Sequence, residues 1–453
     1  MNLFGTSGIR GKANTIVTTQ LCLQIGQALA TNKKAKAILT AHDTRTTSPM
    51  LHYALTAGIT ACGTTVLQQG TIPTPVLAYL TKQTRADVGV MITASHNPPE
   101  YNGIKPYNPD TTAYNRTQQN QIERLVRQQT FKLTTWQNIG KITTIDEIHQ
   151  YVEMITDTVN LRKPWKIILD LGNGAASQLA PRIFRKLDCK VTTINAQPDG
   201  HFPGRGAEPN EKSLKPLCSI VRKLRADIGI AYDGDGDRMV TTDERGHLAP
   251  LDQTFAAFAA HKIRQQQNRT VVTHVEASMC IEKTVEKEGG EVVRTKVGDV
   301  SIAEAIKKRK ATFGGEPCGA WIHPRYHYCP DGILSSILLL QALEEANQKA
   351  SQFTAKVLIY PLLRQNVACP NQAKPKVMKR VYETLPEAFR EATEQSKADG
   401  LRLVLSQGWL LIRPSGTEPQ IRITVEATTG KRAESIMRKT TKLMDKLIKE
   451  SDR

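Results

Sequence analysis

A serine, Ser95, stands in the stretch TASHNP (residues 93–98), which follows the apolar and β-branched stretch ADVGVMI. Apolar residues followed by prolines predict a buried strand that ends in a stiff loop, here with Pro98 and Pro99. A serine hydroxyl at a strand end can act as a nucleophile, cap a helix or complete a turn. The residues around Ser95 leave all three roles open.

Three carboxylates follow a second apolar strand in the stretch DGDGDR (residues 233–238). Asp233, Asp235 and Asp237 would repel one another and raise each other's pKa, and a bound cation would remove that conflict. An EF-hand calcium loop is excluded, because its sixth position needs glycine where this chain has Arg238, and because a strand precedes it. Oxygen ligands favour Mg²⁺ or Ca²⁺, so we predict a Mg²⁺ site with room for a phosphate oxygen, and a solvated acidic turn is the alternative.

The stretch RPSGTEP (residues 413–419) has the residue types of an anion-binding loop. Arg413 can fork onto a phosphate, and small residues in a loop can present hydroxyls and backbone N–H groups to an anion. An ordinary polar turn between two strands is the alternative. The residues expected to contribute beside Arg413 are Ser415, Gly416 and Thr417.

Other charged residues are weaker candidates when taken singly. Glu316 lies among glycines in GGEPCG (residues 314–319), where a carboxylate suits two sugar hydroxyls, although a hairpin turn explains the stretch equally well. Arg10 and Lys105 can steady a phosphate, move a proton or simply be surface charges. In HPRYHYC (residues 323–329) the neighbouring prolines argue against a helix that would bring two histidines together, so we do not expect zinc there.

The composition favours a folded protein that binds anions. The chain has 453 residues, 40% of them hydrophobic, and a formal net charge of +18. Such a charge attracts phosphate esters, nucleic acids or anionic surfaces, but the basic residues are dispersed and aromatics are only 5%, so a nucleic-acid partner is not expected. Because the 8 cysteines are scattered and no signal-peptide core or membrane-length apolar run is present, we expect a cytoplasmic protein.

The elements that must position these residues recur along the chain. RADVGVMITASHNP (residues 85–98) is matched by RADIGIAYDGDGDR (residues 225–238), and KRKATFGGEPCG (residues 308–319) is a fainter third copy. Each copy has an apolar strand that runs into a loop of small residues, at the strand end where open α/β sheets bind ligands. The repeat predicts three related α/β domains that each contribute one loop to a common site.

Local patterns complete the predicted architecture: an α/β protein with three related domains of mixed sheets and a smaller α+β C-terminal domain around a central cleft. KIILDLGNGAAS (residues 166–177) predicts strand, turn and helix, and DGILSSILLLQALEEANQ (residues 331–348) predicts a helix. GWLLIRPSGTEPQIRITVEA (residues 408–427) predicts two strands joined by a loop, followed by a basic helix. We place the domains at residues 1–150, 151–250, 251–363 and 364–453, with a hinge for closure near residues 362–368.

Taken together, these motifs resemble those of the α-D-phosphohexomutases, a family that contains phosphoglucomutases, phosphomannomutases and phosphoglucosamine mutases. In the family's order, TASHNP is similar to its phosphoserine loop, DGDGDR to its metal loop, GGEPCG to its sugar-selecting loop and RPSGTEP to its phosphate loop. GTSGIRG near the start and PDGHFPGRGAEPNE (residues 198–211) extend the resemblance over nearly the whole chain. The resemblance implies that Ser95 carries a transferable phosphate.

The implied cycle uses a phosphoenzyme, a hexose phosphate substrate and a bisphosphorylated hexose as intermediate and activator. A phosphate on Ser95 passes to the hexose monophosphate, the bisphosphate turns over in the cleft, and its other phosphate returns to Ser95. Mg²⁺ is implied between the three aspartates and a phosphoserine oxygen. The remaining implied roles are proton transfer and charge stabilisation by Lys105 and Arg10, support by His96 and Arg238, sugar contacts by Glu316 and Cys318, and binding of the second phosphate by Arg413, Ser415, Gly416, Thr417 and Arg422.

Two positions depart from the family's pattern, and one stretch points to a substrate. Cys318 stands where many relatives have serine, and Ala320 where many have histidine, which His323 or His327 could replace. TKVGDV (residues 295–300) is similar to the KVGD loop of phosphoglucosamine mutases and predicts interconversion of glucosamine 6-phosphate and glucosamine 1-phosphate. A glucose or mannose phosphate mutase is the alternative, as is an inactive relative that binds nucleic acid or a regulatory partner. The intact serine and aspartates argue against inactivity, and the oligomeric state stays open.

Overall fold

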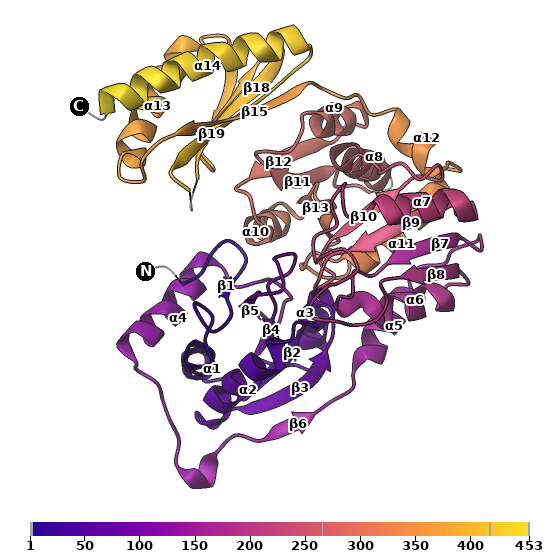
Figure 1. Ribbon diagram of the computed structural model, residues 1–453, viewed down its shortest axis with the longest axis vertical. Coiled ribbons are helices and arrows are strands. Elements are labelled where there is room, and N and C mark those ends of the chain that lie inside the picture. The colour runs from indigo at the N-terminus through magenta and orange to yellow at the C-terminus, as the bar shows by residue number, and fades with distance from the viewer. Residues whose placement is uncertain (1–2, 265, 416–417, 452–453) are drawn as a thin grey trace.

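The computed structural model describes residues 3–264, 266–415 and 418–451. Within these ranges the strands form four sheets with helices packed on them, in the order of the chain. Figure 1 shows the four units running from the indigo N-terminal unit to the yellow C-terminal unit at the top. Mixed sheets in the first three units and an antiparallel sheet in the fourth confirm the predicted α/β architecture.

The first sheet has the order β1-β5-β4-β2-β3-β6 among the described strands. Strands β2, β3, β4 and β6 are mutually parallel, while β5 runs antiparallel to β4 and β1. The elements of this part of the chain are β1 (Ile9–Lys12), α1 (Thr19–Lys33), β2 (Ala37–His42), α2 (Ser48–Thr60), β3 (Thr65–Thr71), α3 (Thr74–Gln83), β4 (Val88–Ile92), β5 (Tyr101–Tyr107), α4 (Arg116–Gln128), the 3-10 helix η1 (Trp136–Asn138), β6 (Ile142–Thr144) and α5 (Ile148–Thr156).

Buried side chains alternate between the two faces of this sheet, as expected for parallel strands covered on both sides. Ile38 of β2 packs with α1 and α2 in one core, whereas its neighbour Leu39 belongs to a second core with α3. The second core continues through the next two units, where Ile167 and Phe313 are members. The first three units therefore share a continuous apolar interior.

The second and third sheets repeat one pattern, with the orders β10-β9-β7-β8 and β12-β11-β13-β14 in the described residues. Each has parallel strands and one antiparallel strand at its edge. The elements are β7 (Lys166–Asp170), η2 (Ala175–Ser177), α6 (Leu179–Lys186), β8 (Lys190–Ile194), α7 (Lys215–Leu224), β9 (Ile228–Tyr232), β10 (Met239–Thr242), α8 (Leu251–Arg264), β11 (Thr270–His274), α9 (Cys280–Lys287), β12 (Glu291–Thr295), α10 (Asp299–Arg309), β13 (Phe313–Glu316), β14 (Ala320–Ile322), α11 (Gly332–Glu345) and α12 (Ala350–Ala355).

The three copies of the sequence repeat form equivalent hairpins. Strands β4, β9 and β13 each end in a loop, and each is followed by an antiparallel partner, β5, β10 or β14. A residue one or two positions after the preceding helix has a positive φ in every copy: Arg85 at 56°, Arg225 at 49° and Lys310 at 51°. The fainter third copy is therefore a true structural repeat, and the three loops are residues 93–100, 233–238 and 317–319.

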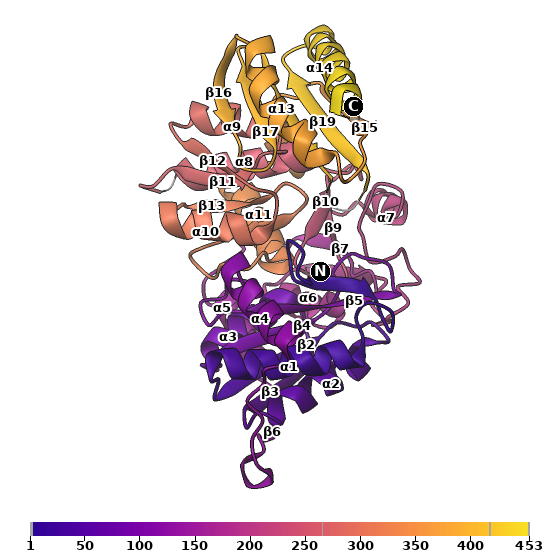
Figure 2. The ribbon, with the colours of Figure 1, turned by 90° about the vertical axis from the view of Figure 1, so that its left-hand side faces the viewer.

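The fourth unit has an antiparallel sheet of order β15-β19-β18-β17-β16 in the part of the chain that the structure describes. Its own apolar core holds residues such as Val377, Ile423 and Met444 and is separate from the core of the other units. Figure 2 shows helix α14 packed along this sheet at the top of the molecule. The elements are β15 (Leu362–Ala368), α13 (Lys374–Ala388), β16 (Ala392–Ser396), β17 (Leu401–Leu405), β18 (Gly408–Pro414), β19 (Gln420–Ala427) and α14 (Gly430–Ser451).

The predicted hinge at residues 362–368 is wrong. All of these residues form β15, and each is paired with a residue of β19. The connection between the third and fourth units is instead the segment 356–361, where Leu358 is 55% exposed and Ile359 is 77% exposed. Across the described residues, no helix is both long and apolar enough to cross a membrane.

Candidate active site

Ser95 lies in the loop after β4, facing the loop after β9. Its Oγ donates a hydrogen bond of 2.7 Å to Asp233 Oδ2, which joins the first and second units. Its φ is +53°, in the left-handed region that a residue with a side chain adopts only when its surroundings hold it there. The side chain is fully buried and the loop follows a buried strand, as the sequence predicts.

The three aspartates of the loop 233–238 lie close enough together to share one cation. A carboxylate oxygen from each lies within 4.8 Å of the others. Among the described residues, Asp235 Oδ1 and Asp237 Oδ1 are buried without a hydrogen-bond partner. Burial, and then the neighbouring carboxylates, raise the pKa of Asp233 well above its ordinary value. Free, buried carboxylate oxygens fit the preference of a hard divalent cation.

Cationic side chains surround the aspartates. Lys105 Nζ lies 2.8 Å from Asp235 Oδ2 and 3.0 Å from Asp237 Oδ2. Burial would lower the pKa of Lys105, but these two carboxylates raise it above its ordinary value, so the ammonium stays charged. Arg238 follows the loop and lies 3.9 Å from Asp237. Arg10 lies on the adjacent strand β1 and donates to Asn97 Oδ1 at 3.2 Å. Three cationic side chains, those of Arg10, Lys105 and Arg238, therefore lie near the three carboxylates.

His96 and Glu208 form the outer side of this cluster. His96 Nδ1 lies 3.3 Å from Ser95 Oγ and 3.9 Å from Glu208 Oε2. Burial and the nearby Arg238 and Arg10 lower the pKa of His96 to about 3, so its imidazole is neutral. Glu208 also lies 3.8 Å from Arg238 Nη1 and comes from the stretch PDGHFPGRGAEPNE of the second unit. Sequence reasoning did not single out Glu208, because nothing local marks it as facing the serine loop.

The sugar-selecting loop of the third unit adjoins this cluster. Cys318 Sγ donates to Glu316 Oε2 at 3.5 Å, and the Arg238 charge acts on both side chains. Burial raises the pKa of Glu316 above its ordinary value. The KVGD stretch also lies beside this cluster. Its Asp299 Oδ1 accepts a hydrogen bond of 2.7 Å from Ser7 Oγ of the GTSG stretch, which belongs to the first unit. Six of the quoted sequence motifs thus meet at this cluster: TASHNP, DGDGDR, GGEPCG, TKVGDV, GTSGIRG and PDGHFPGRGAEPNE.

Neither His323 nor His327 can replace the histidine that relatives have at position 320. His323 is buried, shares a hydrogen bond of 2.9 Å with Ser335 Oγ and packs against aromatic rings of the third unit. His327 is buried and lies 2.9 Å from Asp331 Oδ2. Both are core residues, so that expectation is wrong, and in the described residues neither belongs to a metal-binding group with Cys329.

The predicted phosphate loop lies apart from the other loops, between β18 and β19 of the fourth unit. Arg413 Nη1 lies 2.6 Å from Glu276 Oε1, and its Nε lies 3.0 Å from Asp399 Oδ2, so carboxylates hold its guanidinium. Ser415 Oγ accepts from Glu418 N at 3.1 Å, and Arg422 Nη2 lies 3.0 Å from Glu418 Oε2. Gly416 and Thr417 lie outside the described residues. Between these loop residues and the serine cluster, the described part of the chain shows no hydrogen bond or ion pair.

Several buried residues that support the site were missed from the sequence. Thr74, at the start of α3, donates to Asp235 Oδ2 at 2.6 Å and so fixes the metal loop. Asp43 and Arg45 follow β2 in the stretch AHDTR and contact the serine loop. Lys374 Nζ donates to Ser415 O at 2.6 Å and supports the phosphate loop. The signal for Asp43 was available, since it follows an apolar strand as Ser95 does.

Comparisons with known proteins agree with this geometry. Four successive domain profiles match the chain: "Phosphoglucomutase/phosphomannomutase, alpha/beta/alpha domain I" at residues 1–133, domain II at 149–246, domain III at 250–359 and the C-terminal domain at 365–443. Fold and site thus define a phosphohexomutase, an isomerase. The chain belongs to the phosphoglucomutase/phosphomannomutase family.

Individual relatives match over nearly their whole length. A "Probable phosphoglucosamine mutase" of Methanothermobacter thermautotrophicus is 44% identical over 448 residues, which covers 98% of each chain. A "Phosphoglucosamine mutase" of Methanocaldococcus jannaschii is 41% identical over 451 residues, covering 98% of this chain and 99% of the relative. The crystal structure of a phosphoglucomutase/phosphomannomutase family protein from Burkholderia thailandensis superposes with a TM-score of 0.89 at 25% identity and covers 98% of this chain and 97% of its own.

Proposed function

We propose that this phosphohexomutase interconverts glucosamine 6-phosphate and glucosamine 1-phosphate through a phosphate carried on Ser95. The observation that carries the proposal is the contact of Ser95 Oγ with Asp233 Oδ2 at 2.7 Å, inside a cluster of three carboxylates and three cations. A hydroxyl held this way has a defined direction of approach to a phosphorus atom. A phosphoryl group and a divalent cation carry nearly opposite charges, so together they can enter this cluster as a nearly neutral pair.

Two transfers of opposite direction make up the cycle. In the first, the Oγ–P bond at Ser95 breaks while a sugar hydroxyl oxygen forms a bond to phosphorus, and Ser95 Oγ takes up a proton as the hydroxyl gives one up. In the second, the bond between the other phosphate and its sugar oxygen breaks while Ser95 Oγ bonds to phosphorus, and the sugar oxygen takes up a proton as the serine gives one up. Lys105 and Arg10 would stabilise the charge on the phosphoryl oxygens, and His96 beside Ser95 Oγ would orient that group. A bisphosphorylated hexose would also load the enzyme initially.

Asp233, Asp235 and Asp237 would hold Mg²⁺ together with an oxygen of the phosphate on Ser95. The unpartnered buried oxygens of Asp235 and Asp237 support this assignment. When bound, Mg²⁺ would neutralise charge on the phosphoryl group during transfer. Arg238 N donates to Asp233 Oδ1 at 3.1 Å, which keeps that carboxylate turned toward Ser95.

The rest of the sugar phosphate would be held by the third and fourth units. Glu316 and Cys318 would meet the sugar hydroxyls, and Arg413, Ser415 and Arg422, with Gly416 and Thr417, would bind the phosphate that does not react. Arg413 would exchange one of its carboxylate partners for that phosphate, since Glu276 and Asp399 already hold its guanidinium. Such an exchange keeps the arginine paired in both states.

The choice of glucosamine rests on the relatives named phosphoglucosamine mutases and on the KVGD stretch beside Glu316. A carboxylate can bind hydroxyls of every epimer, so the preference must come from neighbours of the sugar's 2-position. Glucose and mannose phosphates are the second candidates, because the matching domain profiles carry the names of those mutases.

A single-residue change tests the phosphoserine. We expect Ser95→Ala to lower turnover by more than about 10³-fold, because a methyl group cannot carry phosphate. Intact-mass spectrometry should find one phosphate on the wild type, located on the peptide that contains Ser95, and none on the variant. The melting temperature of both proteins serves as the control for folding. Normal turnover by the alanine variant would refute the assignment.

Metal removal tests the aspartate cluster. Chelation by EDTA should lower turnover by about 100-fold or more, and Mg²⁺ should restore it, because the metal supplies several kcal/mol of charge stabilisation. Asp235→Asn should weaken binding of Mn²⁺, measured by electron paramagnetic resonance, by about tenfold or more. Full turnover in metal-free buffer would rule this role out.

Substrate preference is decided by kcat/KM for glucosamine, N-acetylglucosamine, glucose and mannose phosphates under one set of conditions. A charge-assisted contact to the ammonium is worth about 1.5–3 kcal/mol, a preference of roughly ten- to a hundred-fold. Glu316→Gln should impair all four alike, because the carboxylate does not distinguish epimers. A tenfold advantage for glucose or mannose phosphate would select the second candidate.

A further inference from the structure

A buried arginine behind the serine loop uses every N–H of its guanidinium. Arg45, 1% exposed, donates through Nη2 to Ser95 O at 2.8 Å and to Asn97 O at 2.7 Å. Its Nη1 donates to Pro98 O at 2.6 Å and to Tyr101 O at 3.0 Å. One planar group therefore fixes three carbonyls of the loop and that of Tyr101, the first residue of β5, which a point charge such as an ammonium cannot do.

Asp43 completes this arrangement from the other side. Its Oδ2 accepts from Arg45 Nε at 3.0 Å and from Thr93 Oγ1 at 2.7 Å. Thr93 Oγ1 in turn accepts from Ser95 N at 2.9 Å. Both backbone polar groups of Ser95 are therefore connected to the Asp43–Arg45 pair. The carbonyl accepts directly from Arg45, and the N–H donates to Thr93 Oγ1, which donates to Asp43. The pair holds Ser95 at its positive φ.

The second unit closes over the pair with an aromatic ring. The ring centroid of Phe202 lies 5.0 Å from Arg45 Cζ, and Phe202 is 2% exposed. Its own φ is +51°, a costly conformation for a residue with a bulky side chain. Phe202 belongs to PDGHFPGRGAEPNE, a motif whose function is not explained by contact with the sugar phosphate. A guanidinium stacked on an aromatic face is held in plane by cation–π attraction.

We propose that Asp43, Arg45 and Phe202 act as positioning residues that preset Ser95 for phosphoryl transfer. The inference rests on the proposed function of Ser95, but its structural part concerns the loop alone. Displacement of a reacting group by about 1 Å can cost about a hundredfold in rate. The sugar contacts lie on other units, so loss of this arrangement should lower kcat and leave KM within about threefold.

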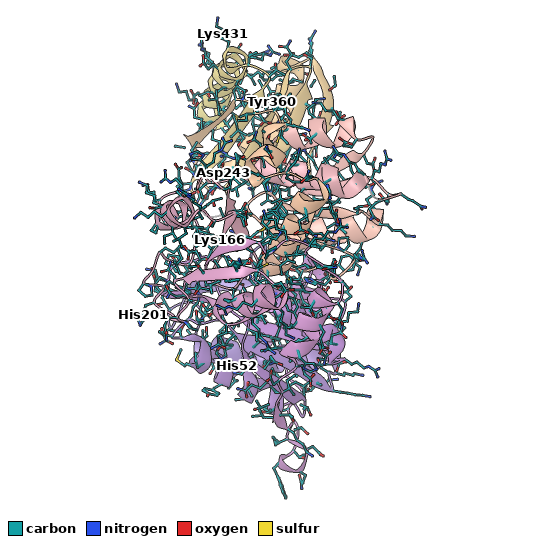
Figure 3. All side chains as sticks on the ribbon, turned by 90° about the vertical axis from the view of Figure 1, so that its right-hand side faces the viewer. His52, Lys166, His201, Asp243, Tyr360 and Lys431 are labelled. Atoms are coloured by element: carbon teal, nitrogen blue, oxygen red, sulfur yellow. The ribbon has the colours of Figure 1, made fainter. Side chains whose placement is uncertain are left out.

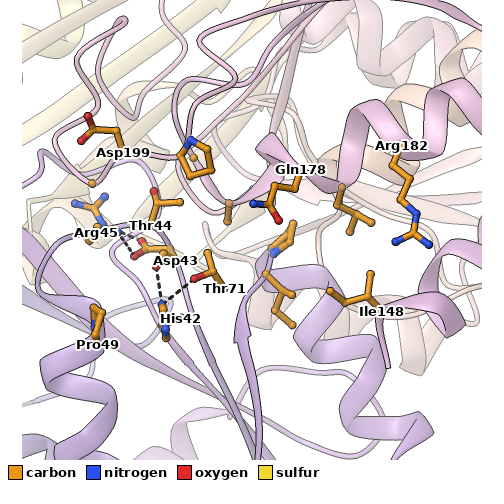
Figure 4. A pocket seen from close by; sticks show the side chains of 17 residues that line it. His42, Asp43, Thr44, Arg45, Pro49, Thr71, Ile148, Gln178, Arg182 and Asp199 are labelled. Carbon is orange, nitrogen blue, oxygen red and sulfur yellow. Dashed lines mark hydrogen bonds and ion pairs between the residues drawn. The ribbon is translucent and has the colours of Figure 1, made fainter. Parts of the chain in front are cut away.

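A cavity lies beside the buried pair. It has a volume of about 330 Å³ and is lined by Asp43, Arg45, Thr71, Gln178 and Gly200, among others. Figure 4 shows Arg45 and Asp43 on one wall of this cavity, opposite Gln178 and Arg182. Ser95 is absent from its described lining. A small planar cation added to the solution can therefore reach the place of the Arg45 side chain without passing the sugar site.

Three variants test the proposal. Arg45→Lys keeps the charge without the fork and should lower kcat by about a hundredfold at nearly constant KM. Phe202→Leu keeps an apolar side chain without the ring and should lower kcat by a smaller factor. In Arg45→Ala, guanidinium at non-denaturing concentration should restore part of kcat, whereas methylammonium should not. Wild-type protein with the same salts is the control.

Hydrogen exchange of the peptide 93–102, measured by mass spectrometry, reports on the loop without reference to activity. Exchange should rise in Arg45→Lys and Phe202→Leu. Arg294→Lys is a matched control, because Arg294 also donates from a buried site to carbonyls, of His274 at 2.7 Å and Ala277 at 2.7 Å, in another unit. It should leave this peptide unchanged.

Unchanged kcat and unchanged exchange in both Arg45→Lys and Phe202→Leu would overturn the proposal. Equal rescue of Arg45→Ala by both cations would overturn it as well, since the planar fork would then be irrelevant. A wild type without mutase activity, but with loop exchange that depends on Arg45, would instead count against the proposed function.

Discussion

Cys318 departs from the family pattern that the sequence resembles, because it places a thiol where that pattern has a hydroxyl. It donates to Glu316 at 3.5 Å, where a hydroxyl would be a stronger donor. Burial raises the pKa of Cys318 to about 12 against the opposing charge of Arg238, so the group is a neutral thiol at physiological pH. A neutral thiol can orient Glu316 but cannot act as a nucleophile or metal ligand.

Two measurements check this reading of Cys318. In the native protein at pH 8, iodoacetamide should leave Cys318 unmodified, while the denatured protein should react at its cysteines throughout. Cys318→Ser should keep turnover and change KM by less than about threefold, because the hydroxyl preserves the hydrogen bond to Glu316. Rapid alkylation of Cys318 in the folded protein would contradict the raised pKa.

Some site residues could be predicted from the sequence, whereas others could not, because their contacts join residues that are distant in the chain. The three aspartates lie in a short motif whose spacing already indicates a cation site, whereas the role of Ser95 stayed open until the resemblance of several motifs to one family implied it. Arg45 donates to carbonyls of residues that are distant from it in the chain, and such contacts leave no pattern in the sequence around Arg45. The histidines at 323 and 327 could not be placed from sequence, because their inward orientation depends on packing against the third unit.

At the scale of elements, the repeat of strand, loop and antiparallel strand explains why three site loops meet. The faint third copy was recognisable because an apolar strand runs into a loop of small residues there as well, and in the structure Lys310 repeats the positive φ of Arg85. Helices and strands of this repeat could be predicted from hydrophobic patterns. The pairing of β4 with β2 and β5, which aims the Ser95 loop at Asp233, depends on long-range contacts.

Helix α2 carries a buried histidine that makes the stability of the first unit depend on pH. His52, low in the view of Figure 3, is 1% exposed, shares a hydrogen bond of 2.9 Å with Thr40 Oγ1, and has His42 and Tyr53 beside its ring. Burial, and then His42, lower the pKa of His52 from its ordinary value of 6.5 to about 4. Between these two pH values the unfolded chain binds a proton that the folded chain does not.

Stability should therefore fall as the pH drops from 6.5 to 4, with a contribution from His52 that approaches 1.4 kcal/mol per pH unit in order of magnitude. His52→Gln removes this titration, so the melting temperature of the variant should fall less between pH 7 and pH 5 than that of the wild type. His149→Gln, at a half-exposed side chain, is the control and should follow the wild type. Parallel curves for wild type and His52→Gln would contradict this account.

At the scale of the whole molecule, the fourth unit is joined to the third by the connection 356–361 and by contacts that include the ion pair of Arg413 with Glu276. Glu426, 1% exposed, accepts from Ser278 Oγ at 2.6 Å and from Met279 N at 2.6 Å, and Trp409 and Leu411 pack on the same segment of the third unit. The connection 356–361 passes Tyr360, which Figure 3 labels between these units. The hinge could not be placed from sequence, because only the pairing with β19 shows that residues 362–368 are rigid.

These features predict that the fourth unit rotates about the connection 356–361, with the buried Glu426 contact as its pivot. The predicted phosphate loop lies on this unit and Ser95, the proposed phosphoserine, on the first, so a sugar phosphate bound by both would draw them together and exclude water from the transfer. Small-angle scattering of Ser95→Ala, which binds without turnover, should show a radius of gyration that falls by a few per cent at saturating glucosamine 6-phosphate. Arg413→Met in the same background should not become compact, because it cannot fork onto the phosphate. Superimposable scattering profiles of Ser95→Ala with and without ligand, under conditions where calorimetry shows full binding, would mean that the fourth unit is already in its working position.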